Sequence, residues 1–345
     1  MTRLAADGTA PRLGWTPSLL MAGGLVALLS LTWLLSGALV ARAEPFAVAA
    51  GRATSSFVGL SLVAAARSAT RRPALKAATR RPVGAVVLGA LGVFGYSAAS
   101  VWAIGLIGAA TTNVILTLLP CMTFLLGLWL FHEPPGAAAV MGTCVAVASA
   151  AAYGLLDHGR GLGIRGEVTP SRALLGVLAA LAAVVAMAFY SHLYGRLAPD
   201  TSSLVALPSV FGAGATMLLL PALARGAFGS LTPAQWGEIV LLGCGVYVPA
   251  YVIQHELLLR RGPLFTTSVS LAVPFCVRLC TWGLGKAGPP SPLVAVLLLA
   301  CCCGVLLTLP RTRNHTPGPA TPGAAKPTDH LPRGTSTHAQ DQSRP

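Results

Sequence analysis

The fold is decided by residues 109–156, AATTNVILTLLPCMTFLLGLWLFHEPPGAAAVMGTCVAVASAAAYGLL. Two apolar runs, Ala109–Phe131 and Gly136–Leu156, are separated by a pair of prolines, which end a helix because they lack a backbone N–H. Each run has about the 20 residues that a helix needs to cross the hydrocarbon core of a bilayer. A helix satisfies its own backbone hydrogen bonds in lipid. The stretch therefore predicts two consecutive transmembrane helices.

The composition of the whole chain agrees with this stretch. Of the 345 residues, 54% are hydrophobic and 10% are charged, and the mean hydropathy is +0.71. A soluble protein carries about 25% charged residues, because its surface meets water. The composition excludes an ordinary soluble enzyme and a disordered protein. All eight cysteines lie in apolar runs, which excludes a secreted disulfide scaffold. The predicted class is an all-α integral membrane protein.

Ten apolar runs of this kind follow one another along the chain. They are Ser18–Ala41, Pro45–Ala66, Val83–Leu106, Ala109–Phe131, Gly136–Leu156, Arg172–Leu193, Ser203–Leu223, Gly237–Leu259, Leu264–Leu284 and Pro292–Leu309. We expect a tail at 1–17, a first repeat at 18–156, a linker at 157–171, a second repeat at 172–309 and a disordered tail at 310–345.

The two halves resemble each other. Thr111-Thr112 and Thr266-Thr267 are offset by 155 residues, and so are Pro134-Pro135 and Pro289-Pro290. Each half holds five spans, and an odd number of spans forces the second copy to insert upside down relative to the first. Such inverted repeats are typical of secondary transporters, whose substrate site lies at the repeat interface.

The basic residues predict the orientation. The net charge is +14, but the Lys and Arg residues lie between spans rather than on a soluble face, which argues against nucleic-acid binding. With the amino terminus inside, thirteen of them lie on inner segments, including Arg311 and Arg313 at the start of the tail. Six lie on outer segments: Arg42, Arg160, Arg165, Arg172, Arg225 and Lys286. The positive-inside rule then predicts a multi-pass protein of a bacterial plasma (inner) membrane with both termini in the cytoplasm.

Several motifs resemble those of the drug/metabolite transporter superfamily, of the EamA type with two five-helix repeats. Residues 109–156 are similar to its small-residue entry, its mid-helix proline (Pro120) and its His-Glu-Pro turn, with Glu133 as the acid. Segments 45–52 and 251–274 resemble family segments too. The resemblance implies a secondary transporter that works by exchange or proton coupling. The second-half turn, 285–290, lacks the acid, and Arg278 replaces an apolar residue.

Ionisable residues inside the spans are candidates for function, because a charge in lipid is costly unless it faces a cavity or a partner. Arg52 lies about two turns into the second span. It is a candidate substrate ligand; the alternatives are snorkelling to the surface or an ion pair with Glu44. Arg278 follows Pro274 by four residues and is a second candidate, with a pair to a carbonyl or to Glu238 as its alternative.

The eighth span has the most polar face, with three side chains in helical register: Tyr247, Tyr251 and Gln254. They are candidates for substrate binding. His255 and Glu256 are candidates for proton coupling, since histidine changes charge near neutral pH. The alternative for Glu256 is an interfacial ion pair with Arg260 at i+4.

Other spans contribute weaker signals. Trp33 is a candidate ligand in a polar midsection that also holds Ser30, Thr32 and Ser36, although such hydroxyls commonly bond their own backbone. Asn113 is a further candidate, with interhelical bonding as the alternative. Structural roles are expected for three turn residues: Glu133, Pro120 and Pro274.

These observations predict a secondary transporter that moves a small metabolite by alternating access, as an exporter or exchanger. One alternative is a drug-efflux protein of the same architecture, and another is a membrane-embedded enzyme acting on lipid-linked substrates. We expect no enzymatic activity, no cofactor and no metal site, because no phosphate-binding loop or metal-ligand cluster is present in the sequence. The expected partners are an anionic or zwitterionic small molecule and the lipid bilayer, with a homodimer left open.

Overall fold

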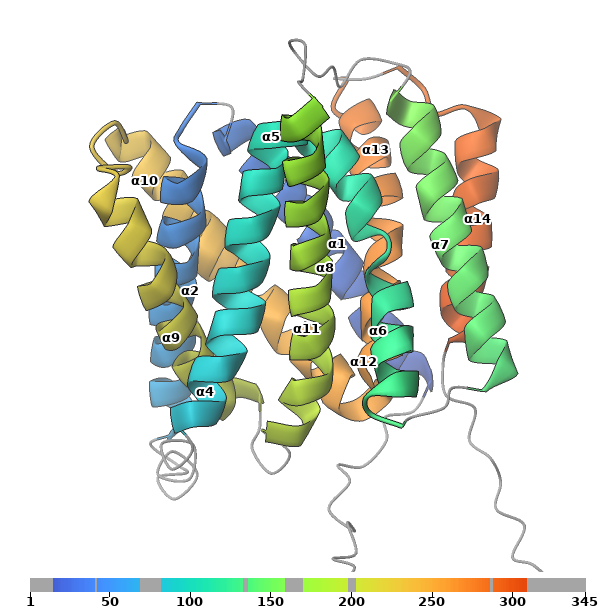
Figure 1. Ribbon diagram of the computed structural model, residues 1–345, viewed down its shortest axis with the longest axis horizontal. Helices are drawn as coiled ribbons and strands as arrows, with labels where there is room; N and C mark the ends of the chain where they lie inside the picture. Colours follow the sequence, from blue (N-terminus) through green and yellow to red (C-terminus); the bar gives the residue numbers. More distant parts are fainter. Residues whose placement is uncertain are drawn as a thin grey trace, which may run out of the picture. The chain divides into compact units, whose positions relative to one another are not determined.

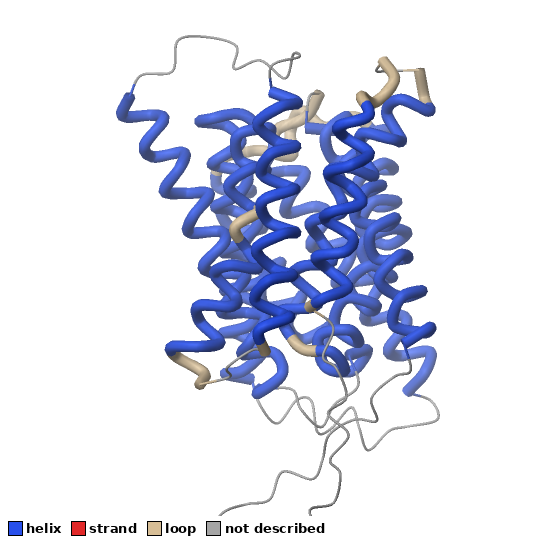
Figure 2. Tube along the Cα trace, turned by 90° about the vertical axis from the view of Figure 1, so that its right-hand side faces the viewer, coloured by secondary structure: helices blue, strands red, loops and turns tan. Residues whose placement is uncertain are grey.

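The computed structural model describes residues 15–40, 42–68, 82–132, 136–158, 170–197, 203–285 and 288–308. The regular structure in these ranges is helical (Figure 2). Nine of these helices are long and apolar enough to cross a membrane, and Pro292–Leu307 is a shorter apolar one. This confirms the all-α membrane protein. The Glu133 turn and the tail at 310–345 lie outside the described residues.

The first half contains five spans. They are formed by α1 (Trp15–Val40); α2 (Pro45–Ser68); α4 (Pro82–Leu88), η1 (Gly89–Gly95) and the first part of α5 (Tyr96–Leu116); the rest of α5 with α6 (Leu119–Trp129); and α7 (Ala137–His158). The third and fourth spans separate at Gly108, whose φ of 81° is a conformation that glycine adopts without strain. The segment η1 is a π-helix.

The second half repeats this order. Its spans are formed by α8 (Pro170–Leu197); α9 (Ser203–Ala224); α10 (Pro233–Val240), η2 (Leu241–Tyr247) and α11 (Val248–Arg261); α12 (Pro263–Val269), η3 (Ser270–Ala272) and α13 (Val273–Gly283); and α14 (Pro292–Leu307). The ninth span was expected to be interrupted at Pro274, and it is. It changes to a 3₁₀ turn at η3 because Pro274, in the first turn of α13, has no N–H for a continuous helix.

The two halves share local backbone features that their sequences do not reveal. Both third-in-repeat spans contain a seven-residue π-helix, η1 or η2. Both fourth-in-repeat spans start after a glycine with positive φ, Gly108 or Gly262 (88°). A threonine four residues later donates to that glycine's carbonyl, at 2.8 Å from Thr112 and 2.9 Å from Thr266. The structural offset is therefore 154 residues at these positions.

The halves run in opposite directions. In Figure 1, α2 ends and α4 begins at the lower side, whereas at the equivalent junction of the second half α9 ends and α10 begins at the upper side. The most extensive helix contacts join spans of different halves, namely α5 with α8, α7 with α14, and α2 with α9. The α7–α14 contact is close because Gly142 and Gly304 face each other: a Cβ on Gly304 would lie 2.6 Å from the Gly142 carbonyl oxygen.

Exposed residues on the outside of the helices are largely apolar. Leu20, Leu62, Leu220 and Leu299 are each more than 60% exposed, as a lipid-facing surface requires. The buried core, by contrast, includes small residues such as Ala50, Ala180 and Ala183, which let helices approach closely. The helices thus enclose an interior in which polar side chains gather.

Candidate functional site

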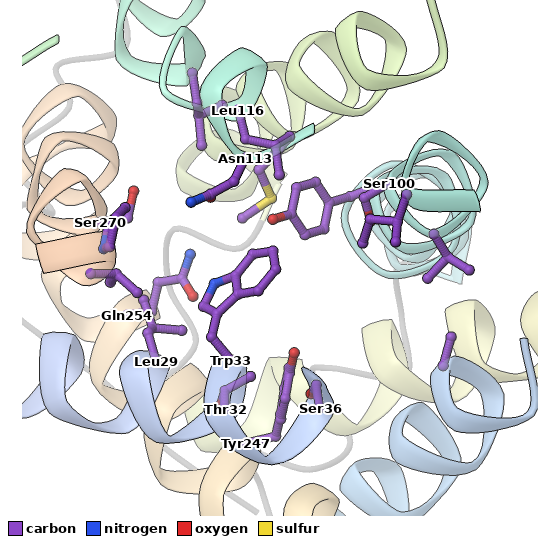
Figure 3. A pocket seen from close by; sticks show the side chains of 18 of the residues that line it. Leu29, Thr32, Trp33, Ser36, Ser100, Asn113, Leu116, Tyr247, Gln254 and Ser270 are labelled. Carbon is purple, nitrogen blue, oxygen red and sulfur yellow. The ribbon is translucent and has the colours of Figure 1, made fainter. Parts of the chain in front are cut away.

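A cavity of about 180 Å³ lies between the two halves. Residues of α1, α2 and α5 line it from the first half, and residues of α11, α12, η3 and α13 line it from the second. It extends from Gln254 and Thr267 to Val40 and Pro45, where α1 meets α2. Of the seven candidate substrate ligands, six line it: Trp33, Arg52, Asn113, Tyr247, Tyr251 and Gln254 (several are seen in Figure 3).

Arg52 is the one charged residue among those that line the cavity. Its guanidinium carbon lies 4.3 Å from the centroid of the Tyr247 ring, which is a cation–π contact. The expected ion pair with Glu44 is not formed. Instead, the Glu44 carboxylate accepts a hydrogen bond of 2.6 Å from the Ala47 backbone N–H and caps the start of α2. Within the described part of the chain, no carboxylate forms an ion pair with Arg52.

The position of Arg52 depends on how closely α2 approaches η2. Ser56 Oγ donates to the Gly243 carbonyl at 3.1 Å, and Cys244 Sγ donates to the Ser55 carbonyl at 3.1 Å. A Cβ on Gly243 would overlap Ser55 Oγ and lie 2.8 Å from the Arg52 carbonyl oxygen, so only glycine fits there. The π-helix and its glycine therefore fix the backbone that carries the arginine.

The hydroxyl groups that line the cavity fall into two classes. Most bond their own helix, as expected in a membrane span: Ser100, Thr117, Thr266, Thr267 and Ser270. Thr32 Oγ1 and Ser36 Oγ, one turn apart on α1, are buried and have no hydrogen-bond partner. A buried polar atom without a partner costs about 1–3 kcal/mol, so these two hydroxyls are suited to bind a ligand.

The polar face of the eighth span faces the cavity. Tyr247 ends the π-helix η2, and α11 then presents Tyr251 and Gln254 at helical spacing. The rings of Tyr247 and Tyr251 are 5.2 Å apart, and Tyr251 contacts the Phe211 ring at 4.7 Å. These ring contacts hold the wall of the cavity in place.

His255 lies beyond Gln254 and is fully buried. Its Nδ1 donates to the Tyr251 carbonyl at 2.6 Å, since a carbonyl only accepts, and the Tyr190 hydroxyl donates to its Nε2. The Tyr194 ring packs on the imidazole at 4.4 Å. His192 Nε2 donates to the Thr123 carbonyl at 2.8 Å and so joins α8 to α6 of the other half. This end of the cavity is closed by packed side chains.

Glu256 forms the ion pair that its spacing favours. Its Oε2 is 2.8 Å from Arg260 Nε, and its Oε1 accepts a hydrogen bond of 3.0 Å from Ser203. Both side chains of the pair are partly exposed, at 25% and 33%. Glu256 thus forms the ion pair with Arg260 that was the alternative to proton coupling. Of the two proton-coupling candidates, His255 is the buried one.

Arg278 is not among the cavity-lining residues. Its guanidinium donates to the Gly288 carbonyl at 3.2 Å, which is the carbonyl pairing considered as its alternative. Glu238, its other expected partner, pairs with Arg42 at 2.9 Å. Sequence reasoning placed Arg278 by its distance from Pro274 along the helix, which gives depth but not the direction of the side chain.

Sequence reasoning also missed part of the site. Tyr96 and Ser100 line the cavity one turn apart on α5, opposite the tyrosines of α11, and Met187 of α8 lies in the wall. The repeat gives a signal for Tyr96, because Tyr251 follows it by 155 residues, which is the offset of the paired Thr and Pro motifs. Thr267, used only as a repeat marker, lines the cavity as well.

Comparison with known proteins agrees with this architecture. The model of the EamA-like transporter family matches residues 16–154, which hold the first five spans. No curated protein matches the chain. One solved protein crystal structure is 23% identical, with a TM-score of 0.67, and the match covers 85% of this chain and 97% of that one. At that identity the likeness shows the fold, and it extends well beyond residue 154. Residues 16–154 of this chain therefore match the EamA-like transporter family, which is part of the drug/metabolite transporter superfamily, and the fold of the solved structure extends over both halves.

Proposed function

We propose that this permease is a secondary transporter that moves a small anionic or zwitterionic metabolite by alternating access, as an exporter or exchanger. One observation carries the proposal: among the described residues, Arg52 brings the single guanidinium to the cavity between the halves, and no carboxylate lines it. A buried charge without a partner is costly, so the site favours a ligand that brings the opposite charge. The volume of about 180 Å³ suits a small molecule.

The difference between the two ends of the cavity supports alternating access. One end reaches Val40 and Pro45, where two helices of the same half meet. The other end is closed by the buried residues Tyr190, Tyr194 and His255. A carrier needs a second conformation in which the end that is now closed opens and the other end closes. Two inverted repeats around one site provide two such conformations. With the orientation predicted by the basic residues, the end at Val40 and Pro45 is extracytoplasmic and both termini are cytoplasmic.

His255 is the proposed proton-coupling residue. It lies directly behind Gln254 and Tyr251 of the cavity wall. Its Nδ1 bonds the Tyr251 carbonyl of its own helix, whereas its Nε2 bonds Tyr190 of α8, a contact that must separate when the closed end opens. Protonation of Nε2 would remove its ability to accept from Tyr190. A change of proton occupancy at His255 would thereby favour one arrangement over the other.

Drug efflux is the second candidate, and one observation favours it. Four aromatic side chains line the cavity, namely Trp33, Tyr96, Tyr247 and Tyr251, and aromatic rings suit flat organic ligands. The lining carries a cation and no carboxylate, which argues against cationic drugs in particular.

A transport assay tests the proposal. The purified full chain is reconstituted in proteoliposomes, with protein-free vesicles as the control, and labelled carboxylates, amino acids and cationic drugs are offered with and without an imposed pH gradient. We expect uptake of an anionic or zwitterionic compound, and exchange when the same compound is present inside. Uptake of cationic drugs alone would support efflux, and no uptake of any compound by folded protein would contradict the carrier.

A further inference from the structure

Two groups of polar atoms in the cavity have no hydrogen-bond partner among the residues that the structure describes. The first group consists of the Arg52 guanidinium with the hydroxyls of Thr32 and Ser36. The second consists of the side-chain amides of Asn113, from the first half, and Gln254, from the second. No hydrogen bond joins these two amides to any other described residue. Polar atoms left without protein partners inside a membrane protein are suited to bind a ligand.

The two groups lie on different sides of one aromatic side chain. Figure 3 shows the Trp33 indole projecting into the middle of the cavity, with Asn113 and Gln254 on one side of it and Thr32, Ser36 and Tyr247 on the other. The Tyr247 ring also contacts Arg52, so this side is the cationic one. A ligand that uses both groups must be polar at its two ends and apolar between them.

The charge of the cavity restricts the ligand further. The lining residues include one guanidinium and no carboxylate. A ligand of net charge −1 makes the occupied cavity neutral, a zwitterion leaves one positive charge without a counterion, and a dianion leaves one negative charge. Charges buried without compensation are unfavourable. A phosphate monoester is mostly dianionic at neutral pH, whereas a carboxylate has one charge and matches the planar guanidinium.

We propose that the substrate is a small organic monocarboxylate with an apolar or aromatic body and an uncharged hydrogen-bonding group at its far end. The carboxylate binds the Arg52 guanidinium and accepts hydrogen bonds from Thr32 and Ser36. The body lies along the Trp33 indole, and the far group bonds the amides of Asn113 and Gln254. This inference rests on the proposed carrier function, because it names the substrate class of the same cavity.

Binding measurements on the purified full chain in nanodiscs test this class without a transport assay. Four probes of similar size are compared by calorimetry: 3-(4-hydroxyphenyl)propionate, its carboxamide, 3-phenylpropionate and tyrosine. We expect the hydroxy acid to bind most tightly, with the carboxamide and tyrosine about tenfold or more weaker and the phenyl acid about fivefold weaker. Equal binding of acid and carboxamide, tighter binding of tyrosine, or no binding of any probe would overturn the proposal.

Two variants assign the preferences to residues. In Arg52→Gln the preference for acid over carboxamide should disappear, and in Gln254→Leu the preference for the hydroxy acid over the phenyl acid should disappear. Arg278→Gln, outside the cavity, should keep both preferences. A variant that retains the preference assigned to its residue would overturn the assignment, and the wild-type comparison decides the class even where a variant does not fold. Selective binding without uptake in proteoliposomes would contradict the carrier function and support the proposed monocarboxylate site. Uptake without charge selectivity would support the carrier function and contradict the proposed site.

Discussion

The third and eighth spans occupy equivalent places in the two halves, yet they serve the cavity differently. Each contains a seven-residue π-helix in its middle, η1 or η2. The glycine in the centre of η1, Gly92, packs on the ring of Tyr190 at the closed end. In η2, the third residue, Gly243, packs on α2 beside the Arg52 carbonyl. The π-helix η1 therefore contacts the closed end of the cavity, and η2 contacts the backbone of Arg52, the charged side chain of the cavity.

The side chains that follow the π-helices differ as well. After η1 the cavity receives Tyr96 and Ser100, and the serine bonds its own helix. From the last residue of η2 onward it receives Tyr247, Tyr251 and Gln254. The repeat thus supplies a symmetric framework, whereas most of the candidate substrate ligands lie in the second half and on α1 and α2. π-Helical turns often occur at functional sites, because they shift the register of the side chains that follow.

The largest effect should come from the charge that η2 positions. We expect Arg52→Met to lower the uptake rate about 100-fold, because it removes charge-assisted hydrogen bonds to the substrate. Arg278→Met should transport at nearly the wild-type rate, since Arg278 lies outside the cavity. Both variants should elute as the wild type does in size-exclusion chromatography. Loss of transport in Arg278→Met alone would reverse the assignment of the two arginines.

The glycines of the two π-helices allow a direct test of the comparison. Gly243→Ala should lower transport about tenfold, because the new methyl group would push α2 and the Arg52 backbone outward. Gly245→Ala is its matched control, since there the Cβ meets only the end of the flexible Leu241 side chain at 3.2 Å. Substrate affinity measured by calorimetry should fall in Gly243→Ala and not in Gly92→Ala, where the added methyl meets Tyr190 at the closed end. Equal affinities in all three would contradict the division of roles.

The two proton-coupling candidates should differ in a similar way. We expect His255→Gln to keep exchange within about threefold of wild type but to lose accumulation driven by a pH gradient, because the titrating group is gone. Glu256→Gln should retain that accumulation, since it removes a partly exposed ion pair worth about 0–1 kcal/mol. Gradient-driven uptake by the two proteins is the measurement. The opposite outcome would make Glu256 the coupling residue.

The smallest effects should come from the unpartnered hydroxyls of α1. Thr32→Val and Ser36→Ala should each weaken apparent affinity about two- to tenfold, the value of one hydrogen bond of about 0.5–1.5 kcal/mol. Thr216→Val, on the exposed face of α9 where the hydroxyl bonds the Gly212 carbonyl, should leave affinity unchanged. Substrate titrations of initial uptake rate measure all three. Unchanged affinity in both α1 variants would remove these hydroxyls from the site.

Much of the fold could be predicted from the sequence because the bilayer imposes a simple length rule. Runs of about 20 apolar residues mark the spans, and the paired Thr and Pro motifs mark the repeat. The polar stripe of Tyr247, Tyr251 and Gln254 could also be found, because helical periodicity survives the π-helix before it. The π-helices themselves could not be predicted, since they arise from contacts of η1 and η2 with α9 and α2.

The charged residues show the limit of sequence reasoning for the site. Arg52 and Arg278 look alike in the sequence, each about two turns from a span end. Their surroundings separate them: Tyr247 and the cavity for Arg52, and the Gly288 carbonyl for Arg278. Likewise Ser30 donates to the Val26 carbonyl of its own helix, whereas Thr32 does not bond its backbone. Such differences depend on neighbours from distant spans.

The pairing of helices across the halves has a consequence for biosynthesis. Because α2, α5 and α7 find their main partners in α9, α8 and α14, the first five spans enter the membrane before the surfaces that cover them have been translated. The close Gly142–Gly304 approach forms last, when α14 leaves the ribosome. A ribosome stalled before α14 would therefore leave a chain that is inserted but in which α7 lacks its main partner.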